Sequence, residues 1–126
     1  MILGIGTDLV EIPRIERSLA RFGERFARRV LADCEYEEYL RQARPAAFLA
    51  KRFAAKEAFS KAMGTGLRYP VRLQHIIVGH DQFGKPELQY SRELQPLVEA
   101  RACQAHLTIT DERSIACAFV VLESRT

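Results

Sequence analysis

The chain contains no tryptophan, no long apolar run and only three cysteines. A membrane-spanning helix needs roughly 20 mainly apolar residues, and no stretch of the sequence approaches that length. The opening MILGIGTD lacks the basic start and long apolar centre of a signal peptide, so we expect a cytoplasmic protein. Cys34, Cys103 and Cys117 form no CxxC pair. This predicts reduced thiols, with Cys117 in the core, and neither a disulfide framework nor a zinc site.

The composition is that of a soluble globular protein, with 48% hydrophobic and 28% charged residues. A length of 126 residues predicts a single domain over residues 1–126 with one hydrophobic core. The net charge of +3 is unevenly distributed, because residues 12–31 hold six arginines and two glutamates, a local balance of +4. An acidic segment follows directly. A basic patch beside an acidic one favours an oriented partner over general adhesion to nucleic acid.

The first eight residues predict a short strand that places Gly4, Gly6 and Asp8 on one face. The two glycines would let another segment of the chain approach this face closely. The following DLVE also has the form of a capping box, with Asp8 as the helix cap and Glu11 reaching back. The residues alone favour this capping role for Asp8 slightly over a role in metal binding.

Residues 12–31 carry apolar side chains at helical spacing beside a stripe of arginines, and Gly23 offers a break into two helices. Arg14, Arg21 and Arg28 belong to this stripe. It is either an ordinary solvated face or a docking surface for an acidic partner. A short helix is then expected over residues 33–42, with an acidic first turn.

The sequence KRFAAKEAFSKAMGTG, residues 51–66, ends a long predicted helix that begins near Pro45 and stops at Gly64 or Gly66. Glu57 and Lys61 lie four residues apart and therefore share a face of this helix. They could form an ordinary helix-stabilising pair, worth about 0.2 to 0.5 kcal/mol. Alternatively, the carboxylate could hold a cation while the ammonium holds a phosphate.

The second half of the chain is rich in strand-forming residues. Residues 73–81 and 86–90 predict a hairpin around the turn FGKP, and a short helix is expected after Ser91. The last two strands are predicted at residues 106–110 and 114–122, where SIACAFVVL has almost no polar alternation. Both faces of that strand should be buried, one against the long helix and the other, where the chain itself does not cover it, against a neighbouring subunit. The expected class is α+β, an antiparallel sheet packed on one long helix, with shorter N-terminal helices.

GIGTDLVEIPRIE near the start and KRFAAKEAFSKAMGTG in the middle resemble the holo-acyl-carrier-protein synthases in motif order and spacing. GKPEL and the closing ACAFVVLES also fit, so the resemblance covers the whole chain. It implies the 4'-phosphopantetheinyl transferase fold. It also implies transfer of phosphopantetheine from coenzyme A to a serine of an acidic acyl-carrier protein for fatty acid biosynthesis, with magnesium, releasing adenosine 3',5'-bisphosphate. Members of this family are homotrimers with active sites at subunit boundaries.

The resemblance implies roles for particular residues. Asp8 and Glu57 match the metal-binding carboxylates, and Glu57 is also the candidate base for the serine proton. Lys61 matches the lysine that meets the phosphates. The resemblance further implies coenzyme A contacts at Gly64, Lys85 and Pro86, and carrier-protein docking by Arg14, Arg21 and Arg28.

The chain departs from the resemblance at Asp111, where many family members carry a histidine near the bound nucleotide. His106 lies at the start of the same strand and does not replace it. Like His75 and His80, it is interpreted as a structural or surface histidine. The departure affects the expected recognition of adenine and leaves the metal site unchanged.

Two other functions fit the residues. A magnesium-dependent pyrophosphate hydrolase could use Asp8, Glu57 and Lys61 with water as the acceptor, but it would need no basic docking surface. A binding module could use the arginine stripe for RNA or an acidic protein. RNA is disfavoured because Phe22 and Phe26 belong to the apolar face and do not interleave with the arginines.

Overall fold

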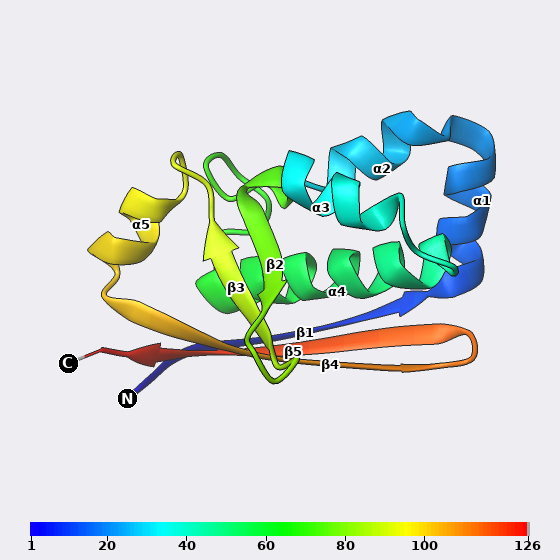
Figure 1. Ribbon diagram of the computed structural model, residues 1–126. Helices are drawn as coiled ribbons and strands as arrows, with labels where there is room; N and C mark the ends of the chain where they lie inside the picture. Colours follow the sequence, from blue (N-terminus) through cyan, green and yellow to red (C-terminus); the bar gives the residue numbers. More distant parts are fainter. Residues whose placement is uncertain (126) are drawn as a thin grey trace.

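The computed structural model describes residues 1–125, which form a three-stranded antiparallel sheet packed on one long helix (Figure 1). The strands lie in the order β1 (Ile2–Glu11), β5 (Ile115–Ser124), β4 (Cys103–Glu112), so the last strand is central. The helix α4 (Pro45–Met63) crosses one face of this sheet. The predicted α+β architecture is confirmed.

The backbone of α4 lies directly against β1 because this part of the strand has no side chains on the facing side. A Cβ atom on Gly4 would clash with the carbonyl oxygen of Ala62, and one on Gly6 would clash with that of Ala58. The helix presents small, fully buried residues here, including Ala54 and Ala58. The close approach expected at the two glycines is therefore confirmed, and the approaching segment is α4.

Three shorter helices precede α4: α1 (Ile12–Phe22), α2 (Glu24–Val30) and α3 (Asp33–Tyr39). Gly23 separates the first two with a positive φ of 59°, as predicted. Because β1 continues to Glu11, Asp8 lies within the strand and caps no helix, and the capping-box interpretation is wrong. None of the helices in residues 1–125 is both long and apolar enough to cross a membrane.

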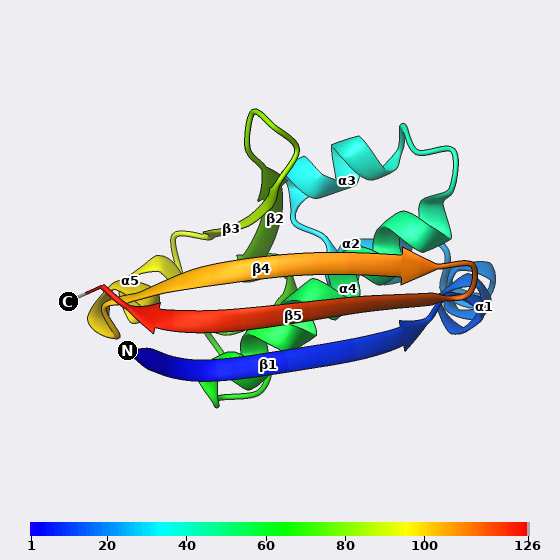
Figure 2. The same ribbon diagram turned by 90° about the horizontal axis from the view of Figure 1, so that it is seen from below.

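A hairpin stands beside the sheet, on the side of β4 (Figure 2). It follows the short 3₁₀ helix η1 (Leu73–His75) and consists of β2 (Ile76–His80) and β3 (Pro86–Tyr90), as the sequence predicted apart from the shorter first strand. In its turn, Asp81 Oδ1 accepts hydrogen bonds from the backbone N–H groups of Phe83 and Lys85. After the hairpin, Ser91 Oγ accepts a hydrogen bond from the backbone N–H of Leu94 in a turn that precedes the helix α5 (Gln95–Ala100). The chain then continues from α5 into β4.

The sheet is covered by α4 on its inner face only. On β5, Ala118 and Val120 point toward the helix and are fully buried, whereas Phe119 between them is 41% exposed. Leu3, Ile5 and Leu9 of β1 are exposed on the same outer face, which Figure 2 shows uncovered. The long helix therefore covers one face of the last strand as expected, and burial of the other face by a neighbouring subunit stays a prediction.

All three cysteines lie in the described part of the chain, and each has a free thiol, as the sequence predicted. Cys117 is only half-buried, because it alternates with Ala116 and Ala118 and so points to the outer face. The buried thiol is that of Cys103 on β4. The placement of Cys117 in the core is therefore wrong.

The contact between β1 and α4 predicts that Gly6→Ala lowers the free energy of unfolding by about 1–3 kcal/mol or more, as overpacking does. The new Cβ meets backbone atoms of Ala58 and Ala62, which cannot move aside without shifting the helix. Gly79→Ala is a matched control, because its Cβ meets only the flexible side chain of Gln89. Urea unfolding measures both; an equal loss in the two variants would contradict the packing argument.

Candidate functional site

Asp8 and Lys61 meet where β1 crosses the C-terminal half of α4. The Lys61 ammonium lies 3.2 Å from Asp8 Oδ1 and donates to the backbone carbonyl of Thr7 at 2.9 Å. The Asp8 side chain is mostly buried, at 17% exposure, while that of Lys61 is 53% exposed. The lysine therefore keeps one side open to a ligand in solvent.

Glu57 lies one turn before Lys61 on the same face of α4, and its side chain is half-buried. Burial, and then repulsion from Asp8, raises the pKa of Glu57 above that of an ordinary glutamate, and Lys61 opposes this rise. Lys61 contacts Asp8 and lies one turn of the helix beyond Glu57, so both carboxylates lie near the same ammonium. The structure thus brings together Asp8, Glu57 and Lys61, which are far apart in the sequence.

The pair of carboxylates is suited to a hard divalent cation. Within residues 1–125, no group of three or more histidine, cysteine, aspartate or glutamate side chains is arranged to hold a metal. Magnesium needs no such group, because it is typically held by one or two carboxylates, substrate phosphates and water. Asp8 and Glu57 therefore fit magnesium in the presence of a phosphate-bearing substrate and would not suffice for a resident structural metal.

Gly64 lies next to this constellation. It ends α4 in the left-handed conformation, with φ of 76°, and its N–H donates to the Lys61 carbonyl. The backbone beyond the helix is therefore open for close approach beside the lysine. The expected coenzyme A contact at Gly64 stays a prediction.

Lys85 and Pro86 lie elsewhere, at the hairpin on the far side of β4. There a pocket of about 360 Å³ has Lys51 and Arg52 from α4, Pro86 from β3 and Asp111 from β4 among its lining residues. Since β1 and β4 are opposite edges of the sheet, the expected coenzyme A contacts of one chain fall into two groups (Figure 2). One group is beside Asp8 and the other beside Asp111.

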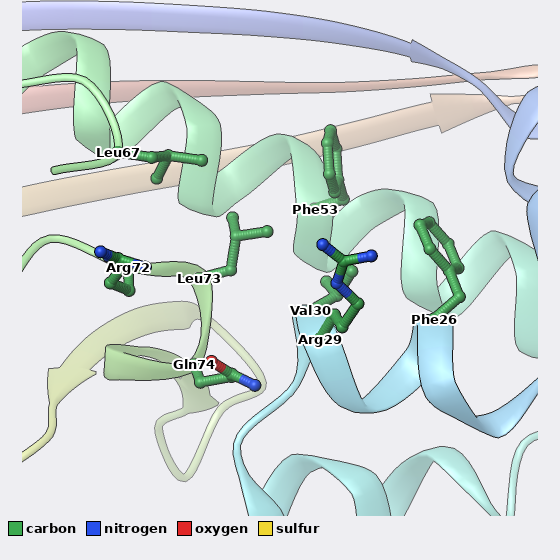
Figure 3. A pocket seen from close by; sticks show the side chains of 8 residues that line it. All are labelled: Phe26, Arg29, Val30, Phe53, Leu67, Arg72, Leu73 and Gln74. Atoms are coloured by element: carbon green, nitrogen blue, oxygen red, sulfur yellow. The ribbon is translucent and has the colours of Figure 1, made fainter. Parts of the chain in front are cut away.

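A groove of about 410 Å³ opens between α2, α4 and residues 67–74 (Figure 3). Its apolar lining includes Phe26, Phe53 and Leu73, and Arg29 and Arg72 contribute cationic groups. Phe53 lies one turn of α4 before Glu57. The groove therefore runs along the same helix toward the carboxylates, and the sequence had not singled it out.

The arginine stripe bends at Gly23 and divides between two helices. Arg14 and Arg21 are exposed on α1, and Arg28 is exposed on α2. The Arg28 guanidinium lies 2.6 Å from a Glu24 carboxylate oxygen and stacks 3.9 Å from the centre of a tyrosine ring on α3. Arg28 therefore has intramolecular partners that compete with a docking role.

A buried ionic network behind α4 was missed by the sequence reading. Lys56 and Glu35 are almost completely buried and form a salt bridge, and Arg52 pairs with the same glutamate. One signal was available, since neither Arg52 nor Lys56 has an acidic residue three or four positions before it on the helix. Their partner on α3 could not be identified from that alone.

Comparisons with known proteins match nearly the whole chain to one protein family. Residues 4–120 match the 4'-phosphopantetheinyl transferase superfamily. A holo-[acyl-carrier-protein] synthase of Nitrosomonas eutropha is 61% identical over 124 residues, covering 98% of this chain and 99% of the relative.

Solved structures show the same fold. The crystal structure of the holo-[acyl-carrier-protein] synthase from Neisseria meningitidis has a TM-score of 0.96 and 46% identity, covering 98% of this chain and all of that one. The synthase from Bacillus anthracis, in complex with coenzyme A (3',5'-ADP), has a TM-score of 0.82 and 40% identity, with 98% of each chain covered. With its sequence and fold both matched in this way, the chain belongs to the 4'-phosphopantetheinyl transferase superfamily.

Proposed function

We propose that this protein transfers the 4'-phosphopantetheine group from coenzyme A to a serine of an apo-acyl-carrier protein, releasing adenosine 3',5'-bisphosphate, in support of fatty acid biosynthesis. The observation that carries the proposal is the convergence of Asp8, Glu57 and Lys61 at the crossing of β1 and α4. The names of the relatives and the coenzyme A complex of the Bacillus anthracis synthase support it.

Magnesium is the proposed cofactor, held by Asp8 and Glu57 together with the substrate. When bound, it would neutralise charge on the pyrophosphate of coenzyme A. Lys61 adds a fixed positive charge beside the carboxylates without competing for the cation. Its present pairing with Asp8 shows that the ammonium can lie close to a negatively charged oxygen at this position.

Glu57 is the proposed base, directly or through a water molecule. The serine oxygen forms a bond to the phosphorus that carries pantetheine, the bond from that phosphorus to the bridging oxygen breaks, and the serine proton is taken up. A carboxylate at this position can accept the proton directly or orient a water molecule that accepts it. Lys61 favours the departing bisphosphate by compensating the charge that develops on its oxygen.

The nucleotide half of coenzyme A requires a second copy of the chain. Gly64 lies beside Lys61, but Lys85 and Pro86 lie at the opposite edge of the sheet, with Asp111 in the same pocket. If a neighbouring chain places its β4 edge against the β1 edge of this one, the two groups complete one site. We propose a homotrimer in which the uncovered faces of the three sheets pack together, because a closed ring repeats one contact between neighbours, brings each β1 edge to a neighbour's β4 edge and leaves every site complete.

The uncovered face of the sheet supports the same assembly. The outer face of the sheet carries exposed apolar side chains, which are those of Leu3, Ile5, Leu9 and Phe119. Contiguous apolar surface of this kind marks an interaction site. In a trimer, it would bury the second side of β5, which the sequence led us to expect.

Carrier-protein docking is proposed at the arginines of α1 and at the groove beside α2. Arg14 and Arg21 would attract an acidic carrier protein, and the groove lined by Phe26, Phe53 and Leu73 would receive one of its apolar side chains. Arg28 contributes less, because Glu24 and Asp33 already lie near its guanidinium. This docking surface also argues against the hydrolase, which has no use for it.

The cytoplasm is the expected compartment. Cys34 is an exposed free thiol, which persists most readily in a reducing environment. Cell fractionation tests this, and recovery of the protein in a secreted or membrane fraction would contradict it.

The transfer is tested by the intact mass of an acidic apo-acyl-carrier protein incubated with this protein, coenzyme A and magnesium. We expect a gain of one phosphopantetheine group that is abolished by a chelator. Glu57→Gln should lower turnover at least about a hundredfold at saturating magnesium, because both a ligand and a base are removed. Near-normal turnover in Glu57→Gln would refute both roles, and cleavage of coenzyme A without carrier modification would favour the hydrolase.

Charge reversal tests the docking surface. Arg21→Glu should raise the KM for carrier protein about tenfold and leave the KM for coenzyme A nearly unchanged, with the effect shrinking at high salt. Arg14→Glu should act in the same way. Arg92→Glu makes the same change in net charge at an exposed residue on another part of the surface and should alter neither KM. Equal effects of Arg21→Glu on both substrates would disprove the assignment.

Sedimentation equilibrium tests the assembly. The protein should have three times the 14.4 kDa mass of one chain, and Phe119→Lys should dissociate it, because a charge on the outer face would be buried without a partner. Phe22→Lys alters a comparably exposed phenylalanine on α1 and should leave the mass unchanged. A monomeric protein, or a Phe119→Lys variant that remains a trimer, would contradict the proposed interface.

A further inference from the structure

Lys56 is completely buried, although the active-site residue Glu57 follows it directly in the chain. Its ammonium donates to three oxygens: the Val30 carbonyl at 2.7 Å, Glu35 Oε1 at 2.5 Å and the Leu73 carbonyl at 2.9 Å. A protonated lysine has three N–H donors, so each has an acceptor. The lysine thus ties α4 to three other segments, which are the end of α2, the first turn of α3 and the start of η1.

Glu35 supplies the compensating charge and is itself fully hydrogen-bonded. Its Oε1 also accepts from the Ala32 N–H at 2.9 Å, and its Oε2 accepts from Arg52 at 3.2 Å and from the Val78 N–H at 3.1 Å. Within residues 1–125, no buried side-chain nitrogen or oxygen lacks a hydrogen-bond partner. The network is therefore complete, as a buried charge requires.

The two backbone acceptors of Lys56 belong to opposite walls of the groove in Figure 3. Val30 ends α2 and Leu73 begins η1, and both residues line the groove. The Gln74 side-chain amide donates to the Arg28 carbonyl at 2.8 Å, which gives the same two segments a second link. Lys56 on α4 thus holds both walls of the groove through hydrogen bonds to their backbone carbonyls.

An apolar residue at position 56 could fill the same volume, and buried ion pairs are often no more stabilising than well-packed apolar side chains. What the ammonium adds is direction, because hydrogen bonds hold their partners within a narrow range of distances and angles. We infer that Lys56 is a positioning residue for carrier-protein binding, which holds the α2 and η1 walls of the groove at a fixed separation. The inference rests on the proposed function for the identity of the ligand.

The test compares two parts of one ionic network. Glu35→Gln combined with Lys56→Met removes both charges of the salt bridge and releases the carbonyls of Val30 and Leu73. It should raise the KM for apo-carrier protein about tenfold and change the KM for coenzyme A less than about twofold. Arg52→Met touches neither carbonyl and alters the pocket beside Asp111, so it should raise the KM for coenzyme A instead. Equal rises in both KM values for the double variant would overturn the inference.

Amide hydrogen exchange tests the walls without any substrate. In the double variant, exchange should accelerate in residues 26–31 and 71–75, and in Arg52→Met these segments should exchange as in the unaltered protein. Unchanged exchange there in the double variant would overturn the inference. If the unaltered protein transfers no phosphopantetheine, the proposed function fails, whereas the exchange result still decides whether Lys56 holds the walls.

Gln74→Met serves as a milder variant in case the double variant does not fold. It keeps the length and apolar body of the side chain and removes only the donor to the Arg28 carbonyl on the protein surface. It should produce a smaller rise in the KM for carrier protein and faster exchange in residues 71–75, with the melting temperature nearly unchanged. No change in either quantity would count against a fixed separation of the walls.

Discussion

The contact between the backbones of β1 and α4 is the constraint on which the site depends. Gly4 and Gly6 allow the helix to lie directly on the strand, since any side chain there would meet the carbonyls of α4. Asp8, two residues beyond Gly6, is thereby placed beside the turn that carries Glu57 and Lys61. Asp8 and Lys61, which are 53 positions apart in the sequence, thus meet in one cluster of charged side chains. The proposed catalytic residues are therefore positioned by the same contact that packs the core.

The other residues proposed to bind coenzyme A are divided between two distant parts of one chain. The cluster at Asp8 lies at the β1 edge, and the pocket with Pro86 and Asp111 lies beyond the β4 edge. Between them, the outer face of the sheet is apolar and uncovered. The proposed assembly through this face would bury the apolar surface and bring one chain's cluster to its neighbour's pocket. The groove beside α2 stays on the opposite side of α4, where a carrier protein can reach it.

The sequence was sufficient to predict features that depend on local spacing. It predicted the long helix, the four-residue interval between Glu57 and Lys61, and the close approach at Gly6. It could not predict that the expected coenzyme A contacts divide between two edges, because strand order is not encoded in local periodicity. Nor could it predict the partners of Lys56, since a helical charge is ordinarily solvated and Glu35 had every feature of a residue in an acidic first turn. Both features depend on contacts between residues that are far apart in the sequence.

The most direct test of a site shared between chains is complementation. Glu57→Gln damages the cluster at the β1 edge, and Lys85→Glu damages the coenzyme A contacts at the hairpin, so each variant alone should be nearly inactive at limiting coenzyme A. When the two are unfolded, mixed in equal amounts and refolded together, random assembly should restore about a quarter of the sites, with one intact half from each neighbour. Activity near that level would support the shared site. Activity no greater than the sum of the separate variants would show that each chain works alone and would contradict the account.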